Sequence, residues 1–261
     1  MTSWLVITAG AVLGLLVGSF TNVLIARVPS GRNWVSDSSR CLSCDQPIAW
    51  YDNIPLLSWV LLRGRCRRCN SAISWSYPAV ELTVATLFAA IVTMFGISVW
   101  TVVLLFLAVT TVALAVIDFQ HMRLPSALIY PSAGVVATGA LVLSLAQGEW
   151  SDALRAIAGA AILGGFYFLL WFAYPQGLGF GDVRLAVPLG AALGFLGWGP
   201  LAVGAIAAPF LGLIWSVGAM ARARSVRGIK VPFGPWMIAG FWIGTFWGAD
   251  LWDLYLTWSV G

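Results

Sequence analysis

Long apolar runs recur along almost the whole chain, and short loops that hold most of its charges separate them. The runs cover about 4–26, 78–96, 99–117, 126–146, 154–174, 183–199, 201–221 and 234–257. Roughly 20 apolar residues in a helix cross the hydrocarbon layer of a bilayer. The chain has 261 residues, of which 60% are hydrophobic and 9% charged, and a soluble domain of this length could not bury that much apolar surface. We therefore expect an all-α polytopic membrane protein with about eight transmembrane helices.

The basic residues predict how these helices are oriented. All Lys and Arg residues except Arg155 lie in the segments 27–77, 118–125, 175–184 and 222–233. With eight spans and the N-terminus outside, these four segments fall on one side, which the positive-inside rule makes cytoplasmic. The first run has no Lys or Arg before it and no cleavage site after it, so we expect a retained span and not a signal peptide. The net charge of +4 comes from these loops and does not indicate nucleic-acid binding.

Residues 27–77 form the one polar segment long enough for a small extramembrane domain, between a first span at 1–26 and a membrane domain at 78–261. The segment carries all four cysteines as two CxxC pairs: Cys41, Cys44, Cys66 and Cys69. Four thiolates suit a tetrahedral structural zinc, and a domain of this size needs such support. Two disulfides are the alternative, which a reducing cytoplasm disfavours. The arginines around the cysteines serve as topology signals, and contact with anionic membrane lipid is a further possibility.

A glycine-rich string precedes the sixth run and ends in an acid. It reads Gly177-Leu178-Gly179-Phe180-Gly181-Asp182-Val183-Arg184. Glycines at alternate positions favour neither helix nor strand, so we expect a bare loop around Gly179 and Gly181 that a substrate could approach. A carboxylate at the edge of a membrane segment is costly and suggests a functional site. The alternative is that Asp182 only caps the following helix.

Asp118 ends the third run, at the same predicted depth as Asp182. Two carboxylates that face each other cannot both ionise, so they share a proton. The ionised one can then activate water while the protonated one polarises a peptide carbonyl and protonates the leaving amine. This chemistry is peptide hydrolysis by an aspartic dyad. The alternative is two unrelated interfacial acids.

Several strings in this order resemble the bacterial type IV prepilin peptidases, which are polytopic aspartic endopeptidases of the GxGD class. The resemblance covers nearly the whole chain, and the strings that carry it are Gly18-Ser19-Phe20-Thr21-Asn22-Val23, Arg27-Val28-Pro29, the two CxxC pairs with Asn53-Ile54-Pro55, Ser58-Trp59 and Tyr77-Pro78-Ala79-Val80-Glu81, Asp118 with Leu124-Pro125, Gly179 to Arg184, and Val231-Pro232-Phe233-Gly234-Pro235. The resemblance implies that Asp118 and Asp182 are the catalytic aspartates and that the protein lies in the bacterial cytoplasmic (inner) membrane.

The resemblance also implies substrates and a cofactor. Prepilins and pseudopilins, which serve type IV pili or type II secretion, have a short basic leader followed by an apolar helix, and the cut falls at that boundary. Members with the CxxC domain usually methylate the new N-terminus with S-adenosylmethionine. Glu81 and the segment 18–29 are the candidates for the cofactor site.

Two other functions fit the same composition. A transporter could use Asp118 and Asp182 as a proton relay, although both acids lie at one membrane face and no inverted repeat is evident. A non-enzymatic assembly factor for a pilus or secretion machine could use the cysteine domain for docking. Cleavage of a prepilin separates these possibilities from a peptidase.

Overall fold

The structure, a computed structural model, describes residues 3–34, 39–223 and 232–260, and every regular element within these ranges is helical. The only β-type pairing among them is two isolated bridges, Arg40 with Pro47 and Arg65 with Ala72. The basic residues Arg224, Arg227 and Lys230 and the motif residue Val231 lie outside the described residues.

Eight long helices appear in the described ranges, close to the eight predicted runs. They are α1 (Trp4–Arg27), α3 (Ser76–Phe95), α4 (Val99–His121), α5 (Ser126–Gln147), α6 (Ser151–Ala173), α7 (Phe180–Leu196), α8 (Trp198–Ala223) and α9 (Gly234–Val260). The short helices η1 (Val28–Ser30), η2 (Trp50–Asn53) and α2 (Leu57–Leu61) lie between α1 and α3. Of the long helices, six are long and apolar enough to cross a membrane: α1, α3, α4, α5, α6 and α8.

The boundary between α7 and α8 differs from the prediction. The sixth run was placed at 183–199, but α7 begins at Phe180 and ends at Leu196, before Gly197. Gly197 has φ 142°, a conformation that residues with a side chain rarely adopt, and it ends the helix. Pro200 does not break the chain here, because it lies in the first turn of α8, where its missing N–H would have had no partner.

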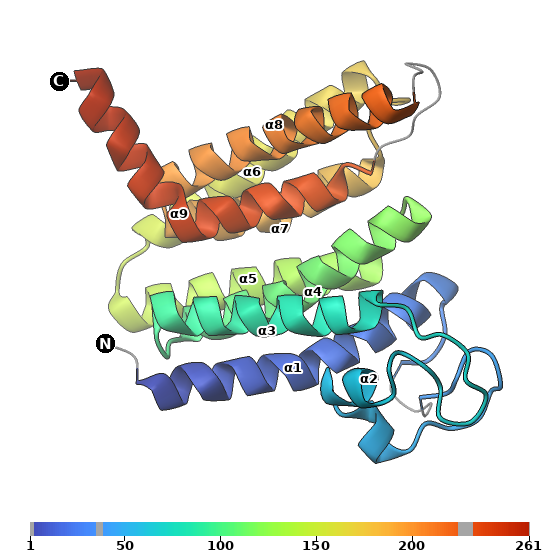
Figure 1. Ribbon diagram of the computed structural model, residues 1–261. Coiled ribbons are helices and arrows are strands. Elements are labelled where there is room, and N and C mark those ends of the chain that lie inside the picture. Colours follow the sequence, from blue (N-terminus) through green and yellow to red (C-terminus); the bar gives the residue numbers. More distant parts are fainter. Residues whose placement is uncertain (1–2, 35–38, 224–231, 261) are drawn as a thin grey trace. The chain divides into compact units, whose positions relative to one another are not determined.

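The chain divides into two compact units, Met1–Ala113 and Leu114–Gly261, and α4 runs across the boundary. In the first unit, α1 and α3 lie side by side in opposite directions, and the cysteine-containing segment connects their adjacent ends (Figure 1). A Cβ on Gly14 would lie 2.6 Å from Ala85 Cα, and one on Gly18 would lie 2.7 Å from Glu81 Cα. The two backbones therefore touch through glycines, as in other helix pairs that pack within lipid.

In the second unit, α7 is the central helix and packs against α5, α6, α8 and α9 (Figure 1). Glycines again mediate the closest contacts. Gly159 of α6 meets Gly190 and Gly194 of α7, and Gly204 of α8 meets Gly240 of α9. Other helices therefore pack closely around α7, and most of its residues are buried.

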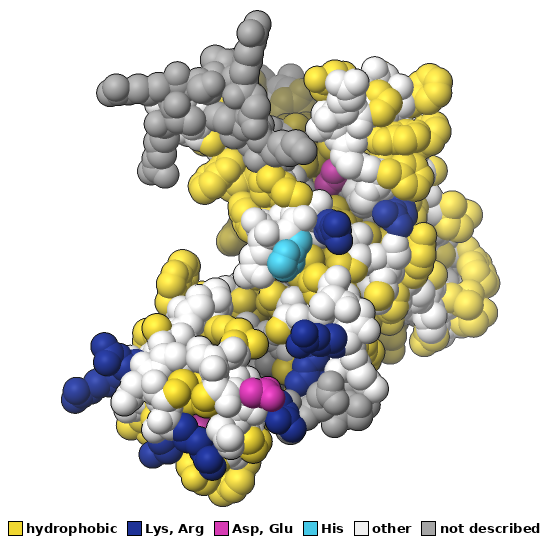
Figure 2. All heavy atoms as spheres, turned by 90° about the vertical axis from the view of Figure 1, so that its right-hand side faces the viewer, with side chains coloured by type: hydrophobic (Ala, Val, Ile, Leu, Met, Phe, Trp, Pro, Cys, Tyr) yellow, Lys and Arg dark blue, Asp and Glu magenta, His cyan; other side chains and the backbone are white. Residues whose placement is uncertain are grey.

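The outer surfaces of the long helices are largely hydrophobic, as expected for a protein in contact with lipid. Leu13, Val102, Ile157 and Leu213 are each about half exposed or more. Lys and Arg side chains instead gather on the cysteine-containing segment (Figure 2).

Candidate functional site

Asp118 lies in the last turn of α4 and is buried, with 5% of its surface exposed. Its Oδ2 accepts a hydrogen bond from the backbone N–H of Gly234, with an N–O distance of 3.1 Å. Gly234 is the first residue of α9, and the first N–H groups of a helix have no partner within it. The carboxylate satisfies one of these groups and lies at the positive end of the helix dipole.

Asp182 lies in the first turn of α7 and is 6% exposed. Its Oδ2 accepts a hydrogen bond from the N–H of Gly179, at 3.1 Å. Its Oδ1 is buried and has no hydrogen-bond partner among the described residues. The N-cap of α7 is Gly179 and not Asp182, so the capping interpretation was wrong about the position. Asp182 stabilises the helix start from the third helical position, and this role uses only one of its two oxygens.

Leu124, which follows α4, packs against residues that lie next to both acids in the chain or in space. A Cβ on Gly181 would lie 3.0 Å from Leu124 Cβ. A Cβ on Gly234 would lie 3.1 Å from Leu124 Cδ2 and 2.8 Å from Asp118 Oδ2. The end of α4 and the starts of α7 and α9 therefore converge on this leucine.

The expected glycine loop is shorter than the sequence suggested. Gly181 lies inside α7, and only the residues up to Gly179 are non-helical. The contact with Leu124 gives a reason for this glycine, because a larger residue at position 181 would displace that leucine. Gly179 and Phe180 are exposed directly beside the buried Asp182. The chain is thus open to an approaching molecule just before the acid.

Arg184 fixes the start of α7 to the start of α5. Its Nη1 donates a hydrogen bond to the hydroxyl of Ser126, the first residue of α5. Its guanidinium also lies over the ring of Phe180, with Cζ 5.5 Å from the ring centre. The side chain of Arg184 therefore links the two helices.

The four cysteines form one cluster. Their Sγ atoms all lie within 4.8 Å of one another, and the Sγ atoms of Cys41 and Cys69 are 3.8 Å apart. All four thiols are free, so the alternative of two disulfides is not found. The backbone N–H of Ser43 lowers the pKa of Cys41 to about 6, and the Ser71 hydroxyl lowers that of Cys69. The cluster could hold a metal ion.

The two cysteine pairs are copies of one backbone turn, which the sequence interpretation missed. In the first, the N–H of Cys41 bonds to Gln46 and the N–H of Asp45 bonds back to Cys41. Cys66, Ser71 and Asn70 make the same two bonds in the second. Asp45 and Asn70 have φ 53° and φ 55°, a conformation that Asp and Asn tolerate better than most residues. The signal in the sequence is an Arg-Cys-x-x-Cys-Asp/Asn-x-x-Ile pattern that begins at Arg40 and again at Arg65.

Glu81, the candidate for a cofactor site, is engaged in holding the cysteine-containing segment. It is 8% exposed, and its Oε2 accepts a hydrogen bond from the N–H of Leu56 at 2.8 Å. Leu56 has φ 58°, which is unusual for a residue with a branched side chain. The carboxylate thus secures a tight turn against α3.

The neighbouring residues around Ile54 and Ser58 support the same turn. The hydroxyl of Ser58 accepts from the N–H of Ile54 at 3.0 Å and donates to the carbonyl of Tyr51 at 2.9 Å. Arg67 also binds Asp52 through both carboxylate oxygens, and its guanidinium lowers the pKa of Asp52. These bonds join the second cysteine turn to η2.

Two family models match this chain. Residues 12–95 match the bacterial peptidase A24 N-terminal domain, and residues 101–217 match the type IV leader peptidase family. A prepilin leader peptidase/N-methyltransferase of Stutzerimonas stutzeri is 31% identical over 94% of this chain and 92% of its own. A protein of the same name from Xanthomonas campestris is 32% identical over 95% of this chain and 93% of its own. A third, from Myxococcus xanthus, is 42% identical over 72% of this chain and 55% of its own. No solved structure matches. The chain therefore belongs to the type IV leader peptidase family.

Proposed function

We propose that this chain is a membrane aspartic endopeptidase that removes the basic leader of type IV prepilins or pseudopilins, and that it also methylates the new N-terminus. The relatives that match most of the chain carry both activities in their names. The observation that carries the proposal is the convergence of two buried carboxylates, Asp118 and Asp182, from different helices on one site.

In this proposal Asp118 and Asp182 share one proton. The ionised carboxylate takes a proton from a water molecule, whose oxygen attacks the peptide carbonyl. The protonated carboxyl first polarises that carbonyl and then protonates the leaving amine, so the peptide bond breaks as its nitrogen gains the proton. Asp182 has a free Oδ1 for this role, whereas the Oδ2 atoms of both acids are held by backbone N–H groups. The helices therefore orient both acids before substrate binds.

The exposed backbone at Gly179, with Gly181 behind it, is where we place the leader. An extended peptide can pair its backbone groups with a chain that has few side chains. The arginine-rich segment 27–77 is a poor electrostatic partner for a basic leader, so we assign leader binding to the glycine segment and not to the cysteine domain.

The cysteine cluster suits a structural zinc ion. Zinc–sulfur bonds of about 2.3 Å in a tetrahedron place the sulfurs about 3.8 Å apart, and the separation of Cys41 and Cys69 agrees with this value. Four thiolates leave no open position for a substrate. Cys41, Cys44, Cys66 and Cys69 would therefore hold the domain at 27–77 together and take no part in hydrolysis.

The proposed methyl donor is S-adenosylmethionine, for which the sequence suggested Glu81. The Glu81 carboxylate is already used by the N–H of Leu56, so it fits an anchor for the cysteine domain better than a cofactor ligand. S-adenosylmethionine would supply the methyl group when bound.

We also propose that α7 and α9 cross the membrane with the six other helices, which gives eight spans. The positions of Lys and Arg then place 27–77 and both acids on the cytoplasmic side of the inner membrane. We propose the domain division that the sequence predicted, with a first span at 1–26, the cysteine domain at 27–77 and the peptidase domain at 78–261.

Co-expression with a prepilin tests the proposal. Mass spectrometry of the prepilin N-terminus reports cleavage and methylation together. The wild type should give a shortened, methylated product, while Asp118→Asn and Asp182→Asn should leave the leader attached. Cleavage at the wild-type level by either variant would refute the dyad, and an uncut prepilin with the wild type would favour a transporter or an assembly factor.

A further inference from the structure

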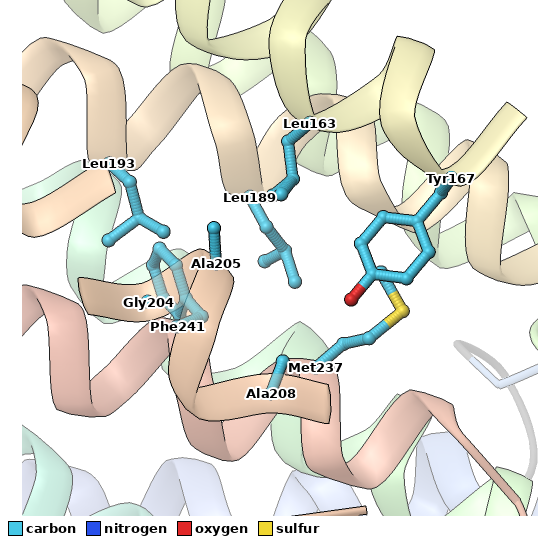
Figure 3. A pocket seen from close by; sticks show the side chains of 9 residues that line it. All are labelled: Leu163, Tyr167, Leu189, Leu193, Gly204, Ala205, Ala208, Met237 and Phe241. Carbon is cyan, nitrogen blue, oxygen red and sulfur yellow. The ribbon is translucent and has the colours of Figure 1, made fainter. Parts of the chain in front are cut away.

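The short helix α2 carries its aliphatic side chains on the outside. Leu57, Val60 and Leu61 are 51%, 63% and 70% exposed, and their spacing places them on one face of the helix. In the second unit such side chains point inward, and Leu163 and Phe241, for example, line a small cavity between α6, α7, α8 and α9 (Figure 3). Exposed aliphatic side chains that share one face of a helix indicate an interaction surface.

The opposite face of α2 is fixed to the rest of the cysteine-containing segment (residues 27–77). Ser58 is buried, and Nε1 of Trp59 donates a hydrogen bond to the carbonyl of Ile73 at 3.2 Å. A Cβ on Gly64 would lie 3.0 Å from the ring of Trp59. The helix therefore cannot turn its three aliphatic side chains inward without losing these contacts.

Glu81 sets the depth at which α2 lies. Its Oε2 binds the N–H of Leu56, the residue directly before α2, and Glu81 is the sixth residue of α3. Five steps along a helix correspond to about 7.5 Å. The α3 helix is long and apolar enough to cross a membrane, and its 20 residues span about 30 Å, the thickness of the hydrocarbon layer. The start of α2 therefore lies at the level of the first turns of α3, at the edge of the lipid layer (Figure 1).

The apolar outer surface of α3 begins at the same level. Leu82, the residue after Glu81, is exposed. Trp75, directly before α3, and Trp50, in the short helix η2 that packs on α2, are exposed as well. Tryptophan side chains favour the boundary between lipid and water. The exposed face of α2 thus has the surroundings of a surface that touches lipid.

The arginines that follow α2 supply a positive charge beside this face. The N–H of Arg63 binds the carbonyl of Val60 at 3.1 Å, so the chain turns back at the end of the helix. The side chains of Arg63 and Arg65 are exposed and have no acidic partner among the described residues. The two acids in the described part of the segment, Asp45 and Asp52, pair with other arginines. Positive side chains next to an apolar face match the phosphates that border the acyl chains of a bilayer.

We propose that α2 anchors the cysteine-containing segment to the membrane surface. Leu57, Val60 and Leu61 insert between the lipids at the boundary of headgroups and acyl chains, and Arg63 and Arg65 bind the phosphates of anionic phospholipid. A lipid surface fits this face better than a protein partner does, because the bond between Leu56 and Glu81 holds α2 at the depth of α3. The anchor does not depend on the proposed peptidase activity.

Photo-crosslinking in the full chain tests the anchor. The photoreactive amino acid p-benzoylphenylalanine would replace Leu61 in one protein and Val60 in another, both at exposed positions. Each protein would be purified in nanodiscs of equal parts phosphatidylglycerol and phosphatidylethanolamine and then illuminated. We expect the intact mass of both proteins to rise by that of one phospholipid. The same probe in place of Ser43, an exposed residue between two cysteines, is the matched control and should capture no lipid.

The ratio of the two lipid adducts tests the arginines. A basic residue near an anionic surface favours it about fivefold, so phosphatidylglycerol should be captured at least about fivefold more often than phosphatidylethanolamine. Arg63→Gln combined with Arg65→Gln keeps the apolar face, and the two lipids should then be captured equally.

Three results would overturn the inference. Crosslinks from positions 60 and 61 to a second copy of this chain or to another protein, in place of lipid, would show that the face is a protein interface. Lipid capture at position 43 as frequent as at position 61 would show no preference for α2. Equal capture of both lipids with Arg63 and Arg65 present would show that the arginines do not bind anionic phospholipid.

Discussion

Replacing Gly234 by alanine would place a methyl group against the carboxylate of Asp118. The Cβ would lie 2.8 Å from Asp118 Oδ2 and 3.1 Å from Leu124 Cδ2, both too close for an ordinary contact. Asp118 is buried, so it cannot relieve the contact by turning into solvent. The atom that must move is the one that accepts the N–H of Gly234, and the hydrogen bond is therefore lost or lengthened.

The size of the effect follows from that bond. A hydrogen bond to a charged group contributes about 1.5–3 kcal/mol, and if it is needed in the transition state its loss lowers the rate about 10- to 100-fold. We expect Gly234→Ala to lower kcat for prepilin cleavage by at least about tenfold. Methylation of a prepilin that lacks its leader should stay at the wild-type rate, because the change lies at the acids.

The assay is the initial rate of cleavage by purified protein, followed by mass spectrometry. Gly165→Ala is the matched control, since a Cβ at Gly165 in α6 meets nothing within 4 Å. It should cleave at the wild-type rate and unfold at the same or a slightly higher temperature, because alanine is favoured over glycine in a helix by about 1 kcal/mol. A folded Gly234→Ala protein with wild-type kcat would refute the reasoning that this contact orients Asp118.

Three further predictions concern the rest of the chain. Gly190→Ala would place a methyl group against the carbonyl oxygen of Gly159 and should destabilise the packing of α6 on α7 by about 1–3 kcal/mol. The melting temperature in detergent should fall, and an unchanged melting temperature would contradict the close packing. The purified protein should contain one zinc ion per chain by elemental analysis, and Cys41→Ser should lose it; metal-free wild type would count against the zinc site. Glu81→Ala leaves the N–H of Leu56 unpaired, which costs about 1–3 kcal/mol, whereas the amide oxygen of Glu81→Gln can still accept this hydrogen bond. Limited proteolysis near the Leu56 turn should therefore be faster in Glu81→Ala than in Glu81→Gln. Equal rates would show that the hydrogen bond is not needed.

The long helices could be predicted from the sequence because apolar runs of the required length have few alternatives in a membrane. The boundary at Gly197 was placed too late, since sequence position alone does not show which residue of a Gly-Trp-Gly-Pro string ends a helix. The loop around Gly181 was wrong for a related reason. Alternating glycines lower helix propensity, but the packing of Gly181 on Leu124 outweighs that local preference.

The contacts of the candidate site depend on which faces of distant helices meet. Asp118 and Gly234 are 116 residues apart, and neither shows in the sequence that it is the other's partner. The repeated cysteine turn, in contrast, was present in the sequence as a pattern that recurs from Arg40 to Arg65.

The most direct test compares the rates of cleavage by Asp118→Asn, Asp182→Asn and the double variant, all purified in lipid nanodiscs. Asparagine has nearly the same shape and can still accept the N–H bonds from Gly234 and Gly179, so the fold should be kept. If the two acids act as one dyad, each single change should reduce kcat/KM to the background rate, and the double variant should be no slower than either. Wild-type cleavage by either single variant, or losses that simply multiply in the double variant, would contradict a shared catalytic role for Asp118 and Asp182.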